Sequence, residues 1–259
     1  MENMIPSKRA VTNPGSHEHM KRFAIGDIHG GHKALVQCLK RSEFDFGKDL
    51  LISLGDICDG WPEVNKVIDE LLRLKNLKVI LGNHDEWTLR WMKDGWMEDI
   101  WTSQGGMATV ESYQRDRTRV PESHKNLLQS AVPFIELDNK LFVHGGINPG
   151  VDISKQDPEL LLWDRNFLNN AIRVHKTTPG HRYGKWDDIF VGHTTTEVYK
   201  TLQPVHVCNV WDLDTGCGWS GKLTIMDIDS HEYWQSDLVP DLYPHIQGRS
   251  AAKARGAYY

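Results

Sequence analysis

Short apolar runs alternate with amphipathic stretches along the first third of the chain. Three apolar runs each precede a segment with helical spacing: residues 23–25 before 32–41, 50–54 before 62–74, and 77–81 before 86–93. In the third segment Trp87 and Trp91 are four residues apart and share one helix face. A strand, a turn and a helix in three successive units predict a mostly parallel sheet.

The rest of the chain divides into a mixed middle section and a return to strands. Residues from about 95 to 130 combine aromatic and charged residues with a break at Gly105-Gly106, which predicts a helical cap insertion. Its rings, Trp96, Trp101 and Tyr113, are expected to fill a core. Strand-like runs follow at residues 134–137, 141–143, 188–191, 205–210, 223–228 and 233–235. We expect a second sheet, and therefore a two-layer β core flanked by helices.

The chain has 259 residues, of which 39% are hydrophobic, enough for one large domain with a substantial core. We assign that domain to residues 21–248. Residues 1–20 mix Pro, Gly and charges without periodicity and are expected to form a mobile leader. Residues 249–259 are expected to form a loose tail.

Charge and cysteine usage narrow the function class. The formal net charge is −5, so there is no basic excess of the kind that attracts nucleic acid, and nucleic acid is not the expected partner. The four cysteines form no Cys-x-x-Cys pair, and no leading apolar stretch resembles a signal peptide, which indicates the cytoplasm. No apolar run approaches the roughly 20 residues that span a bilayer, so no membrane association is expected.

Polar motifs follow the predicted strands directly. They are Gly-Asp-Ile-His-Gly at 26–30, Gly-Asp-Ile-Cys-Asp-Gly at 55–60, Gly-Asn-His-Asp at 82–85, His-Gly-Gly at 144–146 and Gly-His-Thr at 192–194. Ligands of open α/β sheets bind outside the carboxyl ends of the strands, so Asp27, Asp56 and Asn83 can meet in one crevice. Asp, His and Asn offer donors that suit Mn, Fe or Zn. The motifs predict a dinuclear phosphoesterase.

In type and order these motifs resemble those of the calcineurin-like metallophosphoesterases, and within them the phosphoprotein phosphatase branch of Ser/Thr protein phosphatases. The resemblance covers residues 23 to about 224 and implies an α/β fold, a four-layer α/β/β/α sandwich with the helical cap. It implies two divalent metal ions, with manganese expected first and iron, zinc or nickel as alternatives. It also implies hydrolysis of phosphomonoesters by direct attack of a metal-bridging hydroxide, without a phosphoenzyme intermediate.

The resemblance assigns roles to the motif residues one by one. Asp27 and His29 would hold one metal, Asp56 would bridge both, and Asn83, His144 and His193 would hold the other. A carboxylate has two oxygens and is a natural bridge between ions roughly 3.5–4 Å apart. His84 adjoins a ligand without being one, which suits it to protonate the departing alkoxide. Asp59 would orient that imidazole.

The chain departs from the family pattern at two positions. Gly60 stands where the protein phosphatases carry Arg, and Leu81 stands where they usually carry another. Arg165 follows the His-Gly-Gly motif at an interval that suits a phosphate-binding Arg, whose planar fork can grip two oxygens. A surface role at a helix start is an equally open interpretation of Arg165.

Three functions remain open from the sequence. The first, and the leading interpretation, is a phosphatase of phosphoproteins or small phosphate esters. The second is a hydrolase of dinucleoside polyphosphates, because residues 79–85 and the Asp-Thr-Gly-Cys-Gly-Trp segment at 214–219 resemble the symmetrical diadenosine tetraphosphatases. The third is a non-catalytic metal-binding regulator that has lost its arginines. The retained His84 and Asp59 argue against the third, since a scaffold needs no acid beside its metals.

Overall fold

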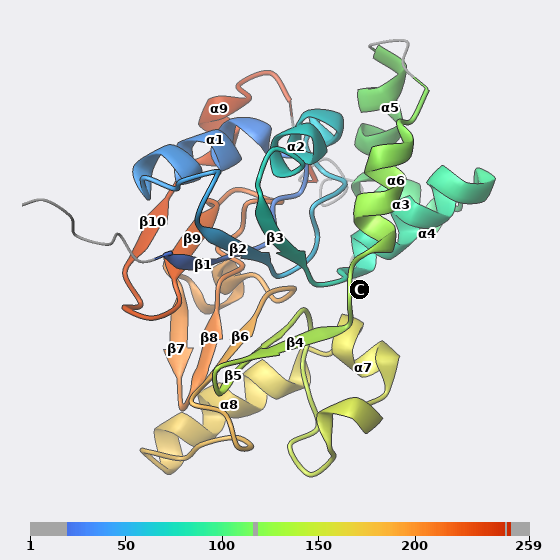
Figure 1. Cartoon of the computed structure of the whole chain (residues 1–259). Helices are drawn as coiled ribbons and strands as arrows, with labels where there is room; N and C mark the ends of the chain where they lie inside the picture. The colour runs from blue at the N-terminus through green and yellow to red at the C-terminus, as the bar shows by residue number, and fades with distance from the viewer. Residues whose placement is uncertain (1–19, 116–118, 247, 250–259) are drawn as a thin grey trace, which may run out of the picture.

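Two five-stranded sheets pack face to face between layers of helices (Figure 1). The computed structural model describes residues 20–115, 119–246 and 248–249. The first sheet has the strand order β10-β9-β1-β2-β3 and the second the order β4-β5-β6-β8-β7. The predicted α/β sandwich is confirmed. The expected leader, except for Met20, and residues 250–259 lie outside the described ranges.

The first sheet is built from both parts of the chain. Its strands are β1 (Arg22–Ile25), β2 (Leu50–Ser53), β3 (Asn76–Val79), β9 (Thr224–Asp227) and β10 (Tyr233–Gln235). The parallel pairing of β1 with β2 and of β2 with β3 agrees with the three strand-helix units. β9 pairs antiparallel with β1, and β10 with β9, so the sheet is mixed.

The second sheet combines parallel central strands with antiparallel edges. Its strands are β4 (Phe134–Leu137), β5 (Lys140–Val143), β6 (Asp188–Val191), β7 (Val205–Val207) and β8 (Val210–Asp212). β5, β6 and β8 run parallel, whereas β4 and β7 close the edges antiparallel. The carboxyl ends of β5, β6 and β8 therefore lie at one edge of this sheet.

Helices form the outer layers and one flank (Figure 1). The outer face of the first sheet is covered by α1 (His32–Arg41), α2 (Val64–Leu71) and α9 (Val239–Leu242), and that of the second by α8 (Asn166–Thr177) with α7 (Pro158–Trp163) nearby. The flank holds α3 (Asn83–Asp94) and the predicted helical insertion, with α4 (Asp99–Trp101), the π-helical turn η1 (Thr102–Gly106), α5 (Met107–Arg115) and α6 (Glu122–Gln129). Gly105, with φ 113°, breaks the insertion as expected.

Strand alternation divides the core into three layers. In β5, Leu141 and Val143 pack under α8, whereas Phe142 points between the sheets. Phe142 stacks on Phe190 of β6 with ring centroids 4.9 Å apart. Because both faces of these strands are buried, they appear in the sequence as continuous apolar runs.

Two local features differ from the sequence prediction. A single strand over 205–210 was wrong: the chain turns at Cys208 (φ 58°) and Asn209, and forms the hairpin of β7 and β8. The Asn209 amide nitrogen donates to the carbonyl oxygens of Tyr183 and Trp186, at 3.1 and 3.0 Å, and fixes this turn. α8 had no predicted bounds, since its three asparagines weaken the helical signal.

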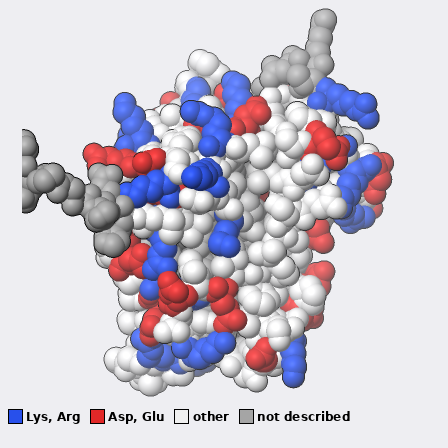
Figure 2. Space-filling model, in the orientation of Figure 1, with Lys and Arg blue, Asp and Glu red and all other residues white. Residues whose placement is uncertain are grey.

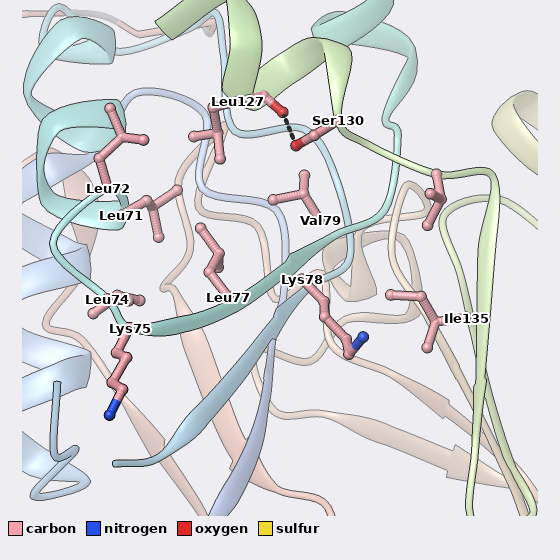
Figure 3. A pocket seen from close by; sticks show the side chains of 11 residues that line it. Leu71, Leu72, Leu74, Lys75, Leu77, Lys78, Val79, Leu127, Ser130 and Ile135 are labelled. Atoms are coloured by element: carbon pink, nitrogen blue, oxygen red, sulfur yellow. Dashed lines mark hydrogen bonds between the residues drawn. The ribbon is translucent and has the colours of Figure 1, made fainter. Parts of the chain in front are cut away.

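The surface offers few clues to function. Acidic and basic side chains are interspersed on the face in Figure 2. A hollow of about 410 Å³ beside β3 and α6 is lined mainly by leucine, valine and isoleucine and contains none of the expected site residues (Figure 3). In the ranges that the structure describes, no helix combines the length and apolar character needed to cross a membrane.

Candidate metal centre

The motif residues lie at one end of the sandwich, on loops that follow strands of both sheets. Asp27 and His29 follow β1, Asp56 follows β2, Asn83 begins α3, His144 follows β5 and His193 follows β6. The carboxyl ends of parallel strands lie at the same edge of a sheet, which explains why residues so far apart in sequence converge.

Several of these residues have strained backbones. His29, Asp56, Asp59 and His193 have φ values of 47°, 50°, 69° and 65°, in the left-handed region that costs about 1–3 kcal/mol for such residues. The loops also cross closely, since a Cβ on Gly82 would lie 2.2 Å from the backbone nitrogen of Asp56. Strain of this kind gathers at functional sites, where surrounding contacts maintain it.

Two groups of donors share one carboxylate. Ligand atoms of Asp27, His29 and Asp56 lie within 4.8 Å of one another, and so do those of Asp56, His144 and His193. Asp56 directs Oδ2 to within 3.6 Å of His29 Nε2, and Oδ1 to within 3.4 Å of His144 Nε2. This is the arrangement that a bridging carboxylate requires. Asn83 Oδ1 joins the second group at 3.0 Å from His144 Nε2.

Backbone carbonyls select the tautomers of two histidines. His29 Nδ1 donates to the carbonyl of Cys58 at 3.0 Å, and His144 Nδ1 donates to that of Leu54 at 2.8 Å. Each ring thereby directs Nε2 to the centre, as metal-binding histidines do. His193 uses Nε2 for the carbonyl of Trp163, at 3.1 Å, which leaves Nδ1 for a ligand role.

The acids of the centre strongly disfavour further negative charge. Burial and the neighbouring Asp214 and Asp56 raise the pKa of Asp27 well above its usual range, and burial raises that of Asp214 to about 6. Burial also opposes ionisation of Asp56, but the imidazoles of His144 and His84 outweigh it and lower the Asp56 pKa. A cation in this position would relieve the repulsion.

The donor set fits divalent metal ions. Carboxylate oxygens and bare imidazole nitrogens together suit Mn, Fe and Zn alike. Asp212, beside the two groups, is fully buried, and its Oδ2 has no hydrogen-bond partner among the described residues. That all six predicted ligands bind metal stays a prediction, but the structure brings them together.

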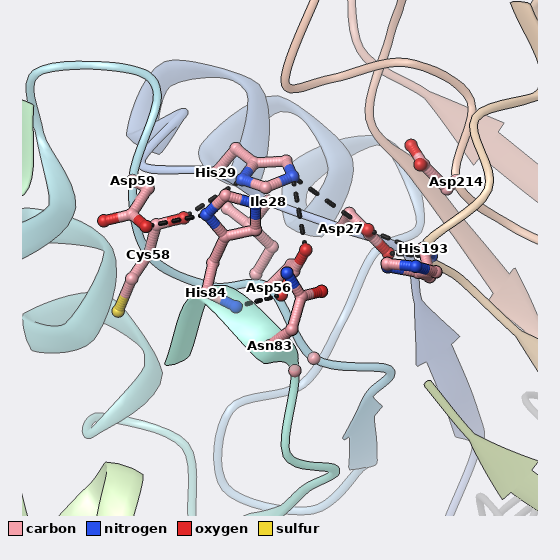
Figure 4. A network of polar contacts seen from close by, with 12 residues as sticks. Asp27, Ile28, His29, Asp56, Cys58, Asp59, Asn83, His84, His193 and Asp214 are labelled. Atoms are coloured by element: carbon pink, nitrogen blue, oxygen red, sulfur yellow. Dashed lines mark hydrogen bonds and ion pairs between the residues drawn. The ribbon is translucent and has the colours of Figure 1, made fainter. Parts of the chain in front are cut away.

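His84 and Asp59 form a buried pair beside these donors (Figure 4). His84 Nδ1 lies 2.7 Å from Asp59 Oδ2, so the carboxylate orients the ring and leaves its other nitrogen free of this bond. Burial, followed by the charge of Arg249, lowers the pKa of His84 to about 3. Burial raises that of Asp59 to about 7, against hydrogen bonds that lower it. Burial thus disfavours charge on both partners.

Three further side chains hold Asp59 in position. Trp101 Nε1 donates to Oδ2 at 2.8 Å, while the hydroxyls of Thr109 and Thr88 donate to Oδ1 at 2.6 and 3.2 Å. Trp101 is fully buried, as its expected place in a core requires, but it also has this polar role. Thr109 and Trp101 belong to no sequence motif, so the sequence did not identify them as partners of Asp59. What identifies Trp101 is the burial of its indole beside an acid, which only the structure shows.

A cavity of about 800 Å³ opens above the donors. Its lining includes Asp56, His84 and His193, together with Arg165 and Arg249. Arg165 is exposed, and its guanidinium has no hydrogen-bond or ion-pair partner among the described residues, which fits both a phosphate-binding and a surface role. Arg249 differs from the sequence expectation: instead of starting a loose tail, it is only 8% exposed and reaches His29.

Comparisons with known proteins agree with this geometry. The family model described as calcineurin-like phosphoesterase matches residues 20–232. A symmetrical bis(5'-nucleosyl)-tetraphosphatase of Buchnera aphidicola is 45% identical, over 83% of this chain and 97% of that protein. Serine/threonine-protein phosphatase 1 of Salmonella typhimurium is 26% identical, over 80% and 91%.

Solved structures share the fold at low sequence identity. A putative diadenosine tetraphosphatase matches with a TM-score of 0.59 at 18% identity, over 85% of this chain and 94% of that one. A protein serine/threonine phosphatase from Saccharomyces cerevisiae matches with a TM-score of 0.54 at 16% identity, over 91% and 84%.

A shared carboxylate between two donor groups, below a cavity with basic walls, defines the class of metal-dependent hydrolases of phosphoric esters. The chain belongs to the calcineurin-like phosphoesterase family, on the branch related to Ser/Thr protein phosphatases and symmetrical tetraphosphatases. It is therefore a metal-dependent phosphatase, and the interpretation as a non-catalytic regulator was wrong.

Removing the shared carboxylate should affect both donor groups. We predict that Asp56→Asn, after loading with Mn²⁺ and desalting, retains less than half the metal of the wild type, whereas Asp27→Asn, which affects one group, retains about half. Inductively coupled plasma mass spectrometry measures the manganese content of each protein. Asp187→Asn, which changes an exposed partner of Arg182, is the control and should match the wild type. Equal metal content in the Asp56 and Asp27 variants would contradict a shared ligand.

Proposed function

We propose that this enzyme hydrolyses dinucleoside polyphosphates at a centre of two divalent ions, with manganese the metal of first choice. The observation that carries the proposal is the lining of the 800 Å³ cavity, which combines three of the candidate ligands with two arginines and three indoles. A cavity of this size suits a nucleotide rather than a bare phosphate.

The indoles provide apolar surface for a base. Trp87 and Trp163 pack with ring centroids 5.1 Å apart, and Trp87 also contacts the ring of His84 at 5.2 Å. Trp219, from the Asp-Thr-Gly-Cys-Gly-Trp segment, lines the same cavity. Aromatic side chains stack on any nucleobase and contribute about 1–3 kcal/mol per base. A small phosphate ester would leave this surface unused.

In the proposed reaction the metal ions and the protein side chains have separate roles. When bound, the ions would activate a water for in-line attack and neutralise charge on the phosphoryl group. Arg165 supplies a planar guanidinium to the phosphate chain. Hydrolysis at the central phosphoanhydride of a tetraphosphate gives two nucleoside diphosphates, as the word symmetrical in the relative's name implies.

His84 has a conditional role in proton transfer. Burial and the charge of Arg249 lower the pKa of its ring to about 3, which favours the neutral form. A phosphate chain brings negative charge next to the ring and raises that pKa, while Asp59 stabilises the imidazolium. His84 can then hold a proton on the nitrogen that does not contact Asp59 and deliver it to the departing oxygen.

A second candidate, the phosphatase of phosphoproteins or small phosphomonoesters, is favoured by this same His84–Asp59 pair. An alkoxide leaving group needs a proton far more than a nucleoside diphosphate does. The relative named Ser/Thr protein phosphatase supports this alternative, though at lower identity than the tetraphosphatase.

A parallel assay tests the choice between the two. Protein with added Mn²⁺ is incubated with diadenosine tetraphosphate, a phosphothreonine peptide and p-nitrophenyl phosphate, and products are separated by chromatography. We predict that kcat/KM for the dinucleotide exceeds that for the peptide by at least about tenfold, with ADP as product, because only the dinucleotide reaches the indoles. Preference for the peptide would reverse the assignment.

Loss of one indole should weaken binding of the dinucleotide selectively. We predict that Trp163→Leu raises KM for diadenosine tetraphosphate by about 5- to 100-fold and changes kcat/KM for p-nitrophenyl phosphate less than threefold. Trp234→Leu is the matched control, since Trp234 packs on Phe23 in the first sheet and does not line the cavity. Equal decreases in kcat/KM for both substrates would show that Trp163 stabilises the metal centre and does not bind the base.

Loss of the acid should depend on the leaving group. We predict that His84→Asn slows phenyl phosphate hydrolysis by about 10²- to 10⁴-fold, and p-nitrophenyl phosphate much less, because nitrophenolate departs without a proton. Steady-state rates on both esters provide the comparison. If both esters were hydrolysed more slowly by the same factor, His84 would not be the proton donor. Its role would then be structural or in phosphate binding.

A further inference from the structure

Arg249 occupies the space beside Gly60, where the protein phosphatase pattern carries an arginine. A Cβ built on Gly60 would lie 3.2 Å from Arg249 Cγ, and one built on Gly105 would lie at the same distance. The backbone of these glycines is joined by a hydrogen bond of 3.1 Å from Gly60 nitrogen to Gly105 oxygen. Two residues without side chains, 45 positions apart, therefore make room for the stem of one arginine.

The end of the described chain is anchored against the site. Gly248 has φ 51°, and a Cβ there would meet the Trp61 ring at 2.8 Å, so only glycine fits without movement. The Arg249 guanidinium carbon lies 4.4 Å from the ring centre of Trp219, a cation–π distance. Arg249 is thus held between the second motif and the Asp-Thr-Gly-Cys-Gly-Trp segment.

The guanidinium has unused hydrogen-bonding capacity despite its burial. Nη1 contacts His29 Nε2 at 2.9 Å, whereas Nε has no hydrogen-bond partner among the described residues. An unsatisfied buried donor is costly, more so on a charged group. Arg249 and Arg165 line the same cavity, so its wall carries two guanidinium groups that can bind a phosphate.

We propose that Arg249 is a phosphate-binding residue of this enzyme and supplies, from the C-terminal segment, the guanidinium that Gly60 lacks. The inference rests on the phosphoester reaction proposed for this centre. His29 Nε2 has one lone pair and can serve Arg249 or a metal ion, but not both. Once the lone pair is engaged by metal, Nη1 becomes available to a phosphate oxygen beside Arg165.

The test measures phosphate binding rather than turnover. Mn²⁺-loaded wild type, Arg249→Met and Arg249→Lys are titrated with inorganic phosphate by calorimetry, and metal content is measured on the same samples. We expect the phosphate dissociation constant to rise by about 10- to 100-fold in Arg249→Met, and by less in Arg249→Lys, which keeps the charge but not the fork. Metal content should stay at the wild-type value.

The control is Arg173→Met, which removes an exposed guanidinium bonded to Asn170 on α8 and should bind phosphate like the wild type. If Arg249→Met binds phosphate as tightly as the wild type, the inference is overturned while the proposed function stands. The inference is also overturned if Arg249→Met binds Mn²⁺ more tightly but binds phosphate as the wild type does. Arg249 would then only compete with the metal ion for His29 Nε2. If wild-type metal-loaded protein binds no phosphate, both proposals fail.

Discussion

Carboxylates buried together where two sheets meet are the constraint on which the rest of this structure depends. Asp27, Asp56, Asp212 and Asp214 are each at most 4% exposed. Burial opposes ionisation of all four, and the neighbouring carboxylates further raise the pKa values of Asp27, Asp212 and Asp214. Backbone amides of His193 and His84 bond Asp27 and Asp56, but amides do not cancel charge. Bound cations would offset the charge of this cluster directly.

The sandwich is arranged so that this cluster can exist. Its residues come from loops of both sheets, and their relative positions depend on how the inner faces pack, with the Phe142–Phe190 stack between them. The loops then approach so closely that a Cβ on Gly55 would lie 2.8 Å from His144 Nδ1. The helical insertion adds a third source of support, because Trp101 and Thr109 fix Asp59 and, through it, His84.

Local patterns were sufficient to predict the sheets and the motif residues, because both are expressed within a few consecutive positions. Residues 32–41 formed the predicted helix α1, and the three strand-helix units gave parallel strands. The hairpin at Cys208 and Asn209 was missed because two continuous apolar strands look like one. Its turn is held by Asn209 bonds to Tyr183 and Trp186, which no local pattern reveals.

Contacts between distant residues account for what was missed at the site. The Trp101–Asp59 bond spans 42 positions and the Arg249–His29 contact spans 220. The sequence showed that Gly60 lacks the arginine of the family pattern. It did not show that Arg249 lies in that space, because no pattern near residue 60 relates it to the end of the chain. Arg249 was assigned to a loose tail for the same reason. The tail lacks local periodicity, but the position of the Arg249 side chain depends on space left by glycines far away in the sequence.

Anomalous X-ray diffraction from crystals grown with Mn²⁺, recorded above the manganese absorption edge, tests the shared-carboxylate centre most directly. It should reveal two peaks roughly 3.5–4 Å apart, one on each side of the Asp56 carboxylate. One peak remote from Asp56, or density only on surface carboxylates, would contradict the claim that this buried acid cluster is organised around a pair of cations.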